Sequence, residues 1–370
     1  MWLWLSLSLA FFASFLITPL VIRLSYRFKF LDFPARKHPA ILHKKPTPRS
    51  GGVVALAGFL FSISVISLVS TSFTLTKNVL GIIISSFVIV IVGLLDDKFD
   101  INPYWRLLTN FFVVGIVVAA GVGITHFTNP FGGTVALDSV IYRFHLPNYF
   151  GFLAGPHSIV VFADLIAFFW IIWVMNALNW SSGVDGQLSG IAAITLVVLS
   201  LVSLQLVKND PSQLTVAVVS LAAAGAFLGF LPWSFYPQKI MPGYGGATLA
   251  GFLIAVLSIV SGAKLATALL ILLIPLVDSV WAVVRRLFLR RSPVWGDSFH
   301  LHHQLLRLGW SIPQVCFLYY TLTLVLGILA LNFDTEEKFF AIMIIGVIIF
   351  ALLFTAFVVL KKHRSYGKFT

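Results

Sequence analysis

Long apolar segments alternate with short polar ones along almost the whole chain. At about 1.5 Å per residue, each apolar segment is long enough to cross the roughly 30 Å hydrocarbon core of a bilayer as a helix. The pattern therefore predicts an all-α, polytopic membrane bundle of about eleven transmembrane helices, with 1–370 forming a single domain. The expected spans are 2–22, 52–70, 78–95, 107–127, 158–179, 187–206, 213–232, 246–262, 264–283, 314–332 and 337–360.

Lys and Arg are shared unequally between the two sets of connecting loops. When the loop 23–51 is placed in the cytoplasm, all but five of the 25 Lys and Arg residues fall on the cytoplasmic side. Because cytoplasmic loops carry an excess of positive charge, this bias predicts an outside N-terminus and a cytoplasmic C-terminus in a plasma membrane. The exceptions are Lys77, Arg143, Lys208, Lys264 and Lys338.

The composition is that of a membrane protein. Hydrophobic residues make up 59% of the chain and charged residues 10%, whereas soluble domains carry about 25% charged residues. The net charge of +12 then indicates membrane orientation and contact with anionic lipid headgroups, and no nucleic-acid partner is expected. The first apolar run has no basic stretch before it, so we expect a retained helix and not a cleaved signal peptide.

Residue types that carry chemistry gather in the loops on the predicted cytoplasmic side. The external loop 128–157 is expected to form a small hairpin and is given no chemistry. The cytoplasmic segments, called the first to fifth polar loops below, are expected to form the site. They are, in order, 23–51, 96–106, 180–187, 233–245 and 284–313.

Two adjacent carboxylates, Asp96 and Asp97, follow the apolar run that ends at Leu95. A charge at the bilayer centre costs about 3 kcal/mol or more, so the pair is expected where the helix leaves the membrane. Paired carboxylates at a membrane surface can hold a divalent cation through oxygen ligands. The alternative is an ordinary charged helix end.

The first polar loop is rich in Lys and Arg, including Lys45 and Arg49, and Gly51-Gly52 opens the next helix. A helix N-terminus beside basic side chains can bind phosphate, and the alternative is an orientation signal against anionic lipid. The fourth polar loop ends in a glycine-rich turn at 242–246, a shape that fits backbone approach to a phosphate or a ring.

The third polar loop follows two amides, Asn176 and Asn179, that share one helical face. Asp185 lies in a glycine-flanked turn beyond them. Amides near a carboxylate suit a sugar, a nucleobase or the surroundings of a metal ion. A helix cap followed by a turn is the alternative.

The fifth polar loop and the end of the span before it combine carboxylates, arginines and histidines. Arginines and histidines together suit a diphosphate. A zinc site is the rival interpretation, but it has no cysteine partner and no His-x-x-x-His pair. The residues are Asp278, Arg285, Arg286, Asp297, His300, His302 and His303.

These motifs, in this order, resemble those of the polyprenyl-phosphate N-acetylhexosamine-1-phosphate transferase family, of the glycosyltransferase family 4 type. The resemblance runs from about Leu31 to Gly309, and the histidine spacing is nearer the UDP-N-acetylglucosamine branch than the muramoyl-pentapeptide branch. It is carried by Pro48-Arg49-x-Gly51-Gly52, Asp96-Asp97, Asn176 through Gly186, Asp278…Arg285-Arg286 and Asp297-x-x-His300-x-His302-His303.

The resemblance implies transfer of a sugar-1-phosphate from a UDP-sugar to polyprenyl phosphate with release of UMP, the first step of a cell-envelope glycan such as lipopolysaccharide or teichoic acid. It implies magnesium held by Asp97 and Asp185, with Asp96, Asp97 and Asp185 as catalytic residues. It also implies a set of substrate-binding residues: Lys45, Arg49, Asn176, Asn179, Tyr244, Arg285, Arg286, Asp297, His300, His302 and His303.

Three positions depart from the family pattern. Ser182 replaces the first aspartate of the third polar loop, Ser234 replaces an asparagine, and Tyr244 stands where the family has a magnesium-ligating aspartate. One alternative is therefore a catalytically degenerate member or one with a different donor. Another is a lipid carrier or transporter without chemistry, which would need ionisable residues inside the spans, where only Asp164 is expected. A homodimer is compatible with each of these alternatives.

Overall fold

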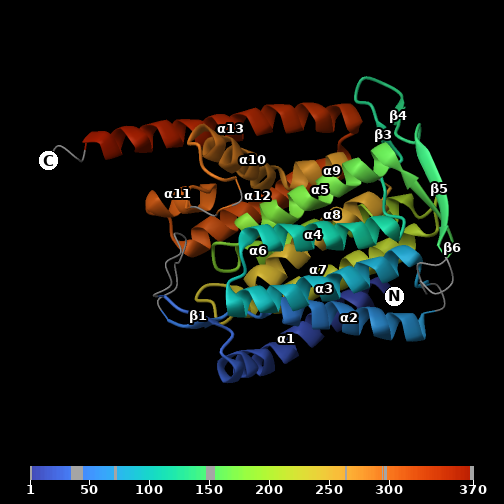
Figure 1. Ribbon diagram of the computed structural model, residues 1–370, viewed down its shortest axis with the longest axis horizontal. Helices are drawn as coiled ribbons and strands as arrows, with labels where there is room; N and C mark the ends of the chain where they lie inside the picture. Colours follow the sequence, from blue (N-terminus) through green and yellow to red (C-terminus); the bar gives the residue numbers. More distant parts are fainter. Residues whose placement is uncertain are drawn as a thin grey trace.

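The computed structural model describes residues 2–34, 45–70, 73–146, 155–262, 265–293, 295 and 298–366. Long helices run side by side along the molecule, and the two chain ends lie at opposite ends of the bundle (Figure 1). The helices are α1 (Trp2–Phe28), α2 (Gly51–Val69), α3 (Lys77–Phe99), α4 (Pro103–Ala119), α5 (Val161–Trp180), α6 (Gln187–Leu206), α7 (Gln213–Ser234), α8 (Gly243–Val260), α9 (Leu265–Ile271), α10 (Leu273–Phe288), α11 (Leu301–Arg307), α12 (Ile312–Asn332) and α13 (Thr335–Tyr366).

The helices are those of a multi-pass membrane protein, because only self-satisfied backbone can cross hydrocarbon. Among the described residues, nine helices are long and apolar enough to span a bilayer. The pair α9 and α10 passes the same test together but bends by 81°, and α4 is a shorter apolar helix. Each of the eleven expected spans corresponds to one of these elements, so the predicted all-α membrane bundle is confirmed. The number of crossings and their orientation stay predictions.

The fourth and fifth spans begin and end at other residues than expected. Helix α4 begins earlier, because the Asn102 side chain accepts a hydrogen bond from the Tyr104 backbone N–H and Pro103 occupies the first turn. It ends at Ala119, and the chain turns at Gly121 before entering a strand. Helix α5 begins later than expected, because 155–160 is a strand.

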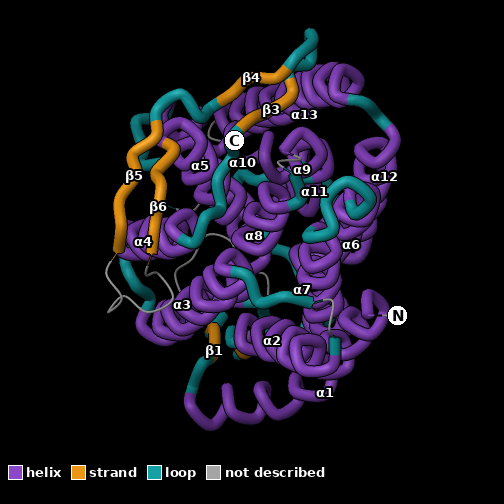
Figure 2. The backbone as a smooth tube through the Cα atoms, turned by 90° about the vertical axis from the view of Figure 1, so that its right-hand side faces the viewer, coloured by secondary structure: helices purple, strands orange, loops and turns teal. Residues whose placement is uncertain are grey.

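The expected external hairpin is two antiparallel hairpins within the described residues. They lie together at one end of the bundle (Figures 1 and 2). The first pairs β3 (His126–Thr128) with β4 (Thr134–Ala136), and the second pairs β5 (Ile141–Leu146) with β6 (Gly155–Val160). A third, very short pair is found at the opposite end, where β1 (Leu31–Asp32) lies beside β2 (Thr47–Pro48).

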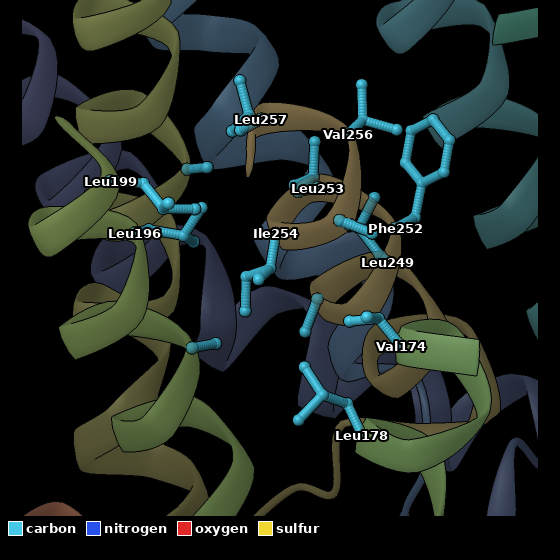
Figure 3. Close-up of a cluster of buried hydrophobic side chains, with 14 of the residues drawn as sticks. Val174, Leu178, Leu196, Leu199, Leu249, Phe252, Leu253, Ile254, Val256 and Leu257 are labelled. Atoms are coloured by element: carbon cyan, nitrogen blue, oxygen red, sulfur yellow. The ribbon is translucent and has the colours of Figure 1, made fainter. Parts of the chain in front are cut away.

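Helix α8 lies at the centre of the bundle (Figure 2). It packs against α2, α3, α5 and α6, and its apolar side chains are buried from Leu249 to Leu257. Val174 and Leu178 of α5 and Leu196 and Leu199 of α6 surround it (Figure 3). A helix that is apolar all round is buried in this way, whereas helices at the edge leave apolar side chains for lipid.

Two glycines bring α3 and α8 into backbone contact. A Cβ on Gly93 would overlap the backbone of Gly245, so the two helices approach more closely than any larger residue would permit. The contact fixes the start of α8 beside the end of α3 that carries Asp96 and Asp97. The packing of small residues thus positions the fourth polar loop over the aspartate pair.

Asp164 lies within α5, the fifth expected span, and occupies its first turn. Its Oδ2 atom accepts a hydrogen bond from the Val160 backbone N–H at 3.0 Å. A carboxylate at this place satisfies an unpaired amide and interacts favourably with the helix dipole. The local role of Asp164 is therefore that of a residue that satisfies the start of a helix.

Candidate active site

The five polar loops meet at the end of the bundle opposite the hairpins, the end at which β1 and α11 lie (Figure 1). Their contacts form a continuous series, described below, from the first loop through the second, fourth and third to the fifth. A direct contact also joins the second and fifth loops, since the Tyr104 hydroxyl lies 3.1 Å from the Ser292 hydroxyl.

Asp97 is the point where the first, second and fourth polar loops converge. Its Oδ1 atom lies 3.1 Å from Arg49 Nε and accepts a hydrogen bond from the Tyr244 backbone N–H at 3.2 Å. Its Oδ2 atom lies against Gly243, which has a φ of +66° and no space for a Cβ. The Asp97 side chain is only 2% exposed. Arg49 also approaches Asp32, with Nη1 3.7 Å from Oδ1.

Asp96 has a separate arginine partner, Arg106. The Arg106 Nη1 atom lies 3.2 Å from Asp96 Oδ2, and the Ile101 backbone N–H donates to Oδ1 at 3.1 Å. The same guanidinium lies over the Tyr244 ring, 5.1 Å from its centroid. The Tyr244 hydroxyl donates to Asn110 Oδ1 at 3.1 Å. The position therefore contributes a backbone N–H to Asp97 and a ring face to Arg106.

The third polar loop is held by its neighbours on both sides. Asp185 Oδ2 accepts a hydrogen bond from the Gln238 backbone N–H at 3.2 Å, which joins the third loop to the fourth. The Cys316 thiol donates to the Asp185 backbone carbonyl at 3.0 Å. Gly183 lies so close to His302 that a Cβ would be 2.7 Å from the ring Nε2, which joins the third loop to the fifth.

The histidines lie at the start of α11, next to Asp278 of α10. Asp278 accepts from His300 Nδ1 at 2.9 Å and from the Leu301 backbone N–H at 3.0 Å, and the side chains of Asp278 and His300 are both buried. The rings of His300 and His302 stack with centroids 5.7 Å apart. Burial, together with the neighbouring His303 and His300, holds the pKa of His302 well below its usual range, so this imidazole is neutral near pH 7.

Arg285 and Arg286 are buried and each lies over an aromatic ring. The Arg285 guanidinium is 4.7 Å from the Phe299 ring centroid, and Arg286 is 4.8 Å from that of Trp180. Arg286 also donates to the Pro293 carbonyl at 2.6 Å. A guanidinium in low dielectric interacts strongly with an anion, so the geometry suits a phosphorylated ligand.

Other expected site residues lie around this region with more modest contacts. Lys45 is exposed, and Asn176 donates from Nδ2 to the Ile172 carbonyl of its own helix at 2.8 Å. The carbonyl of Asn179 accepts from the Ser182 hydroxyl at 2.6 Å. The expected residue Asp297 lies outside the described residues.

Sequence reasoning missed three contributors: Arg106, Asn110 and Trp180. An arginine and an asparagine in an otherwise apolar helix were signals that could have been used, because polar groups in a membrane segment need partners. Trp180 carried no such signal, since a tryptophan at the end of a membrane helix usually marks the interface.

The magnesium site implied by the resemblance does not fit the side chains present. Mg²⁺ needs nearly octahedral oxygen ligands at about 2.0–2.1 Å. No group of three His, Cys, Asp or Glu side chains suited to a metal occurs in the described ranges. Asp97 instead has its two oxygens against Arg49, the Tyr244 amide and Gly243.

Comparison with known proteins agrees with the motifs. The model of glycosyl transferase family 4 matches residues 79–262. The chain is 27% identical to the probable undecaprenyl-phosphate N-acetylglucosaminyl 1-phosphate transferase of Bacillus subtilis (strain 168), over 96% of the chain and 92% of that relative. It is also 27% identical to the decaprenyl-phosphate N-acetylglucosaminephosphotransferase of Mycolicibacterium smegmatis, over 92% of the chain and 84% of the relative.

A third relative represents the other branch. The chain is 31% identical to the phospho-N-acetylmuramoyl-pentapeptide-transferase of Mycobacterium sp. (strain KMS), over 86% of the chain and 93% of that relative. The two N-acetylglucosamine relatives align with more of the chain, which places it nearer their branch, as the histidine spacing predicts.

Proposed function

Because the chain belongs to glycosyl transferase family 4, we propose that it transfers N-acetylglucosamine-1-phosphate from UDP-N-acetylglucosamine to a polyprenyl phosphate. The products are the polyprenyl-diphosphate sugar and UMP, in the first step of a cell-envelope glycan. The predicted family and enzyme class are confirmed by relatives that are phosphotransferases. They favour an enzyme over a lipid carrier or transporter.

The convergence of all five polar loops at one end of the bundle carries this proposal. Two arginine–aspartate pairs and a cluster of histidines and arginines, contributed by segments far apart in sequence, lie in one connected region. A lipid phosphate enters such a site from the bilayer and a nucleotide enters from water. We place the site on the cytoplasmic face of the plasma membrane, because the Lys and Arg bias predicts that orientation.

The transfer is a displacement at phosphorus. An oxygen of the polyprenyl phosphate attacks the sugar-linked phosphorus of the UDP-sugar, and the bond from that phosphorus to the bridging oxygen of UMP breaks. UMP leaves with the bond's electron pair, and no proton transfer is needed. Negative charge accumulates on the phosphoryl oxygens, so cationic side chains at fixed positions stabilise the transition state.

We assign roles by position in the loops. Lys45 and Arg49, in the first polar loop, lie where the lipid phosphate would approach the aspartate pair. Asp185, Asn176 and Asn179 are assigned to the sugar and nucleotide side. The diphosphate is assigned to residues at the end of α10 and in the fifth polar loop, namely Arg285, Arg286, Asp297, His300, His302 and His303. No step is assigned to magnesium, because the residues present do not form a site for it.

UMP release tests the proposed function directly. Purified protein in detergent would be given polyprenyl phosphate and each of several UDP-sugars, and UMP would be quantified by chromatography. We expect release with UDP-N-acetylglucosamine and its loss in Asp97→Asn, whose neutral amide cannot pair with Arg49. The matched control is Asp138→Asn, which changes an exposed carboxylate between β4 and β5 and should behave as wild type. No UMP from any donor, with the protein folded, would refute the proposal.

A further inference from the structure

The aspartate pair at the centre of the site binds arginines. The side chains of Asp96 and Asp97 are 1% and 2% exposed. Asp96 lies 3.2 Å from the Arg106 guanidinium and Asp97 lies 3.1 Å from that of Arg49, and both are ion-pair distances. The backbone N–H of Ile101 also donates to Asp96, and that of Tyr244 donates to Asp97. Each carboxylate thus has one guanidinium and one backbone N–H as partners, the kinds of group that a buried charge needs.

Tyr244 brings no negative charge to the place where the resemblance leads us to expect a metal-binding aspartate. An aspartate is expected here from the resemblance, and it would add a third carboxylate beside Asp96 and Asp97. Tyr244 adds no charge, and its hydroxyl is bonded to Asn110 while its ring supports Arg106. Asp96 and Asp97 thus each have one arginine as a counter-charge, and Arg49 also faces Asp32.

The geometry around Asp97 also excludes a hydrated ion. A Mg²⁺ ion retains several water molecules because it dehydrates reluctantly. The Oδ1 atom of Asp97 already receives two N–H groups, and Oδ2 is pressed against Gly243 where even a Cβ would overlap it. Displacing the Arg49 guanidinium would leave that cation facing Asp32 alone, at 3.7 Å.

We propose that Arg49 and Arg106 supply the positive charge at this site, and that Asp97 and Asp96 position these guanidinium groups in place of binding a divalent cation. This inference rests on the proposed transferase function. A guanidinium carries five N–H donors in a rigid fork, so an arginine that pairs with a carboxylate through one edge can present another to a phosphate. In this arrangement Arg49, in the first polar loop, would contact the lipid phosphate from the Asp97 side, and Arg106 would contact it from the Asp96 side.

Binding of Mn²⁺ tests the inference without depending on activity. Mn²⁺ would be titrated into purified wild-type protein in detergent and the free ion followed by electron paramagnetic resonance. We expect no stoichiometric binding by the wild type. Tyr244→Asp, which restores a carboxylate next to Asp97, should gain one bound Mn²⁺ per chain, while the matched variant Tyr244→Phe should not. One Mn²⁺ per wild-type chain, lost in Asp97→Asn, would overturn the proposal.

A second measurement on the wild type needs no variant to fold. UMP release would be compared in magnesium and in excess EDTA, and we expect no loss on chelation. Release that is abolished by EDTA and restored by magnesium would overturn the inference and leave the proposed function intact. If no condition yields UMP, the proposed function fails, and the Mn²⁺ titration still decides whether Asp97 holds a metal ion.

Discussion

The substitution Gly243→Ala examines how tightly the fourth polar loop is built onto the aspartate pair. Gly243 opens α8 with a φ of +66°, and an L-residue in this left-handed region costs about 1–2 kcal/mol. The added Cβ would also overlap the Arg49 backbone carbonyl and the Asp97 carboxylate. Neither group can move aside easily. The Arg49 carbonyl belongs to the backbone, and the Asp97 carboxylate is buried and held by hydrogen-bond donors.

The overlap is relieved only when the start of α8 and the Arg49–Asp97 pair move apart by about 1 Å, and a misplacement of that size lowers turnover by about 10²-fold. We expect Gly243→Ala to fold, to melt at a lower temperature and to release UMP at a rate reduced by about that factor. Initial rates of UMP release and thermal unfolding in detergent would be measured side by side.

Gly133→Ala is the matched control. Gly133 has a φ of +78° in the hairpin region, and no atom lies within 4 Å of its Cβ position. It carries comparable backbone strain without the overlap, so it should lose stability but keep its rate. Wild-type turnover by Gly243→Ala, with a melting temperature like that of Gly133→Ala, would refute the reasoning that this loop fixes the Arg49–Asp97 pair.

Two further predictions concern the fifth polar loop. Asp278→Asn removes the carboxylate that pairs with His300 in a buried site, and loss of a charged hydrogen bond costs about 1.5–3 kcal/mol. The free energy of unfolding in detergent should fall by an amount of that order. An unchanged melting temperature would contradict the pairing. The lowered pKa of His302 means that, below the ordinary histidine value of about 6.5, the unfolded chain binds a proton that the folded chain does not. Stability should therefore fall as pH drops from about 7.5 through 6.5, and a melting series in which His302→Gln shows the same slope as wild type would count against a neutral, buried imidazole.

The sequence alone determined the kind of fold and the helix ends at which the candidate site residues lie. Apolar runs of sufficient length must be helical in a bilayer, because every backbone N–H and C=O there needs an internal partner. Charged and amide groups are too costly for the bilayer centre, so Asp96, Asp97 and the histidines had to lie at helix ends. The start of α5 was expected too early, because an apolar run does not reveal that its first residues form a strand.

The tertiary structure decided which groups meet. Tyr244 and Asp97 are 147 residues apart in sequence, and they touch because Gly93 and Gly245 allow the backbones of α3 and α8 to come together. The same packing pairs Arg49 with Asp97 and Arg106 with Asp96. No periodicity or composition encodes these partners, because helix contacts depend on the shape complementarity of whole faces. Only the packed bundle shows that the aspartates bind guanidinium groups where a metal ion had been expected.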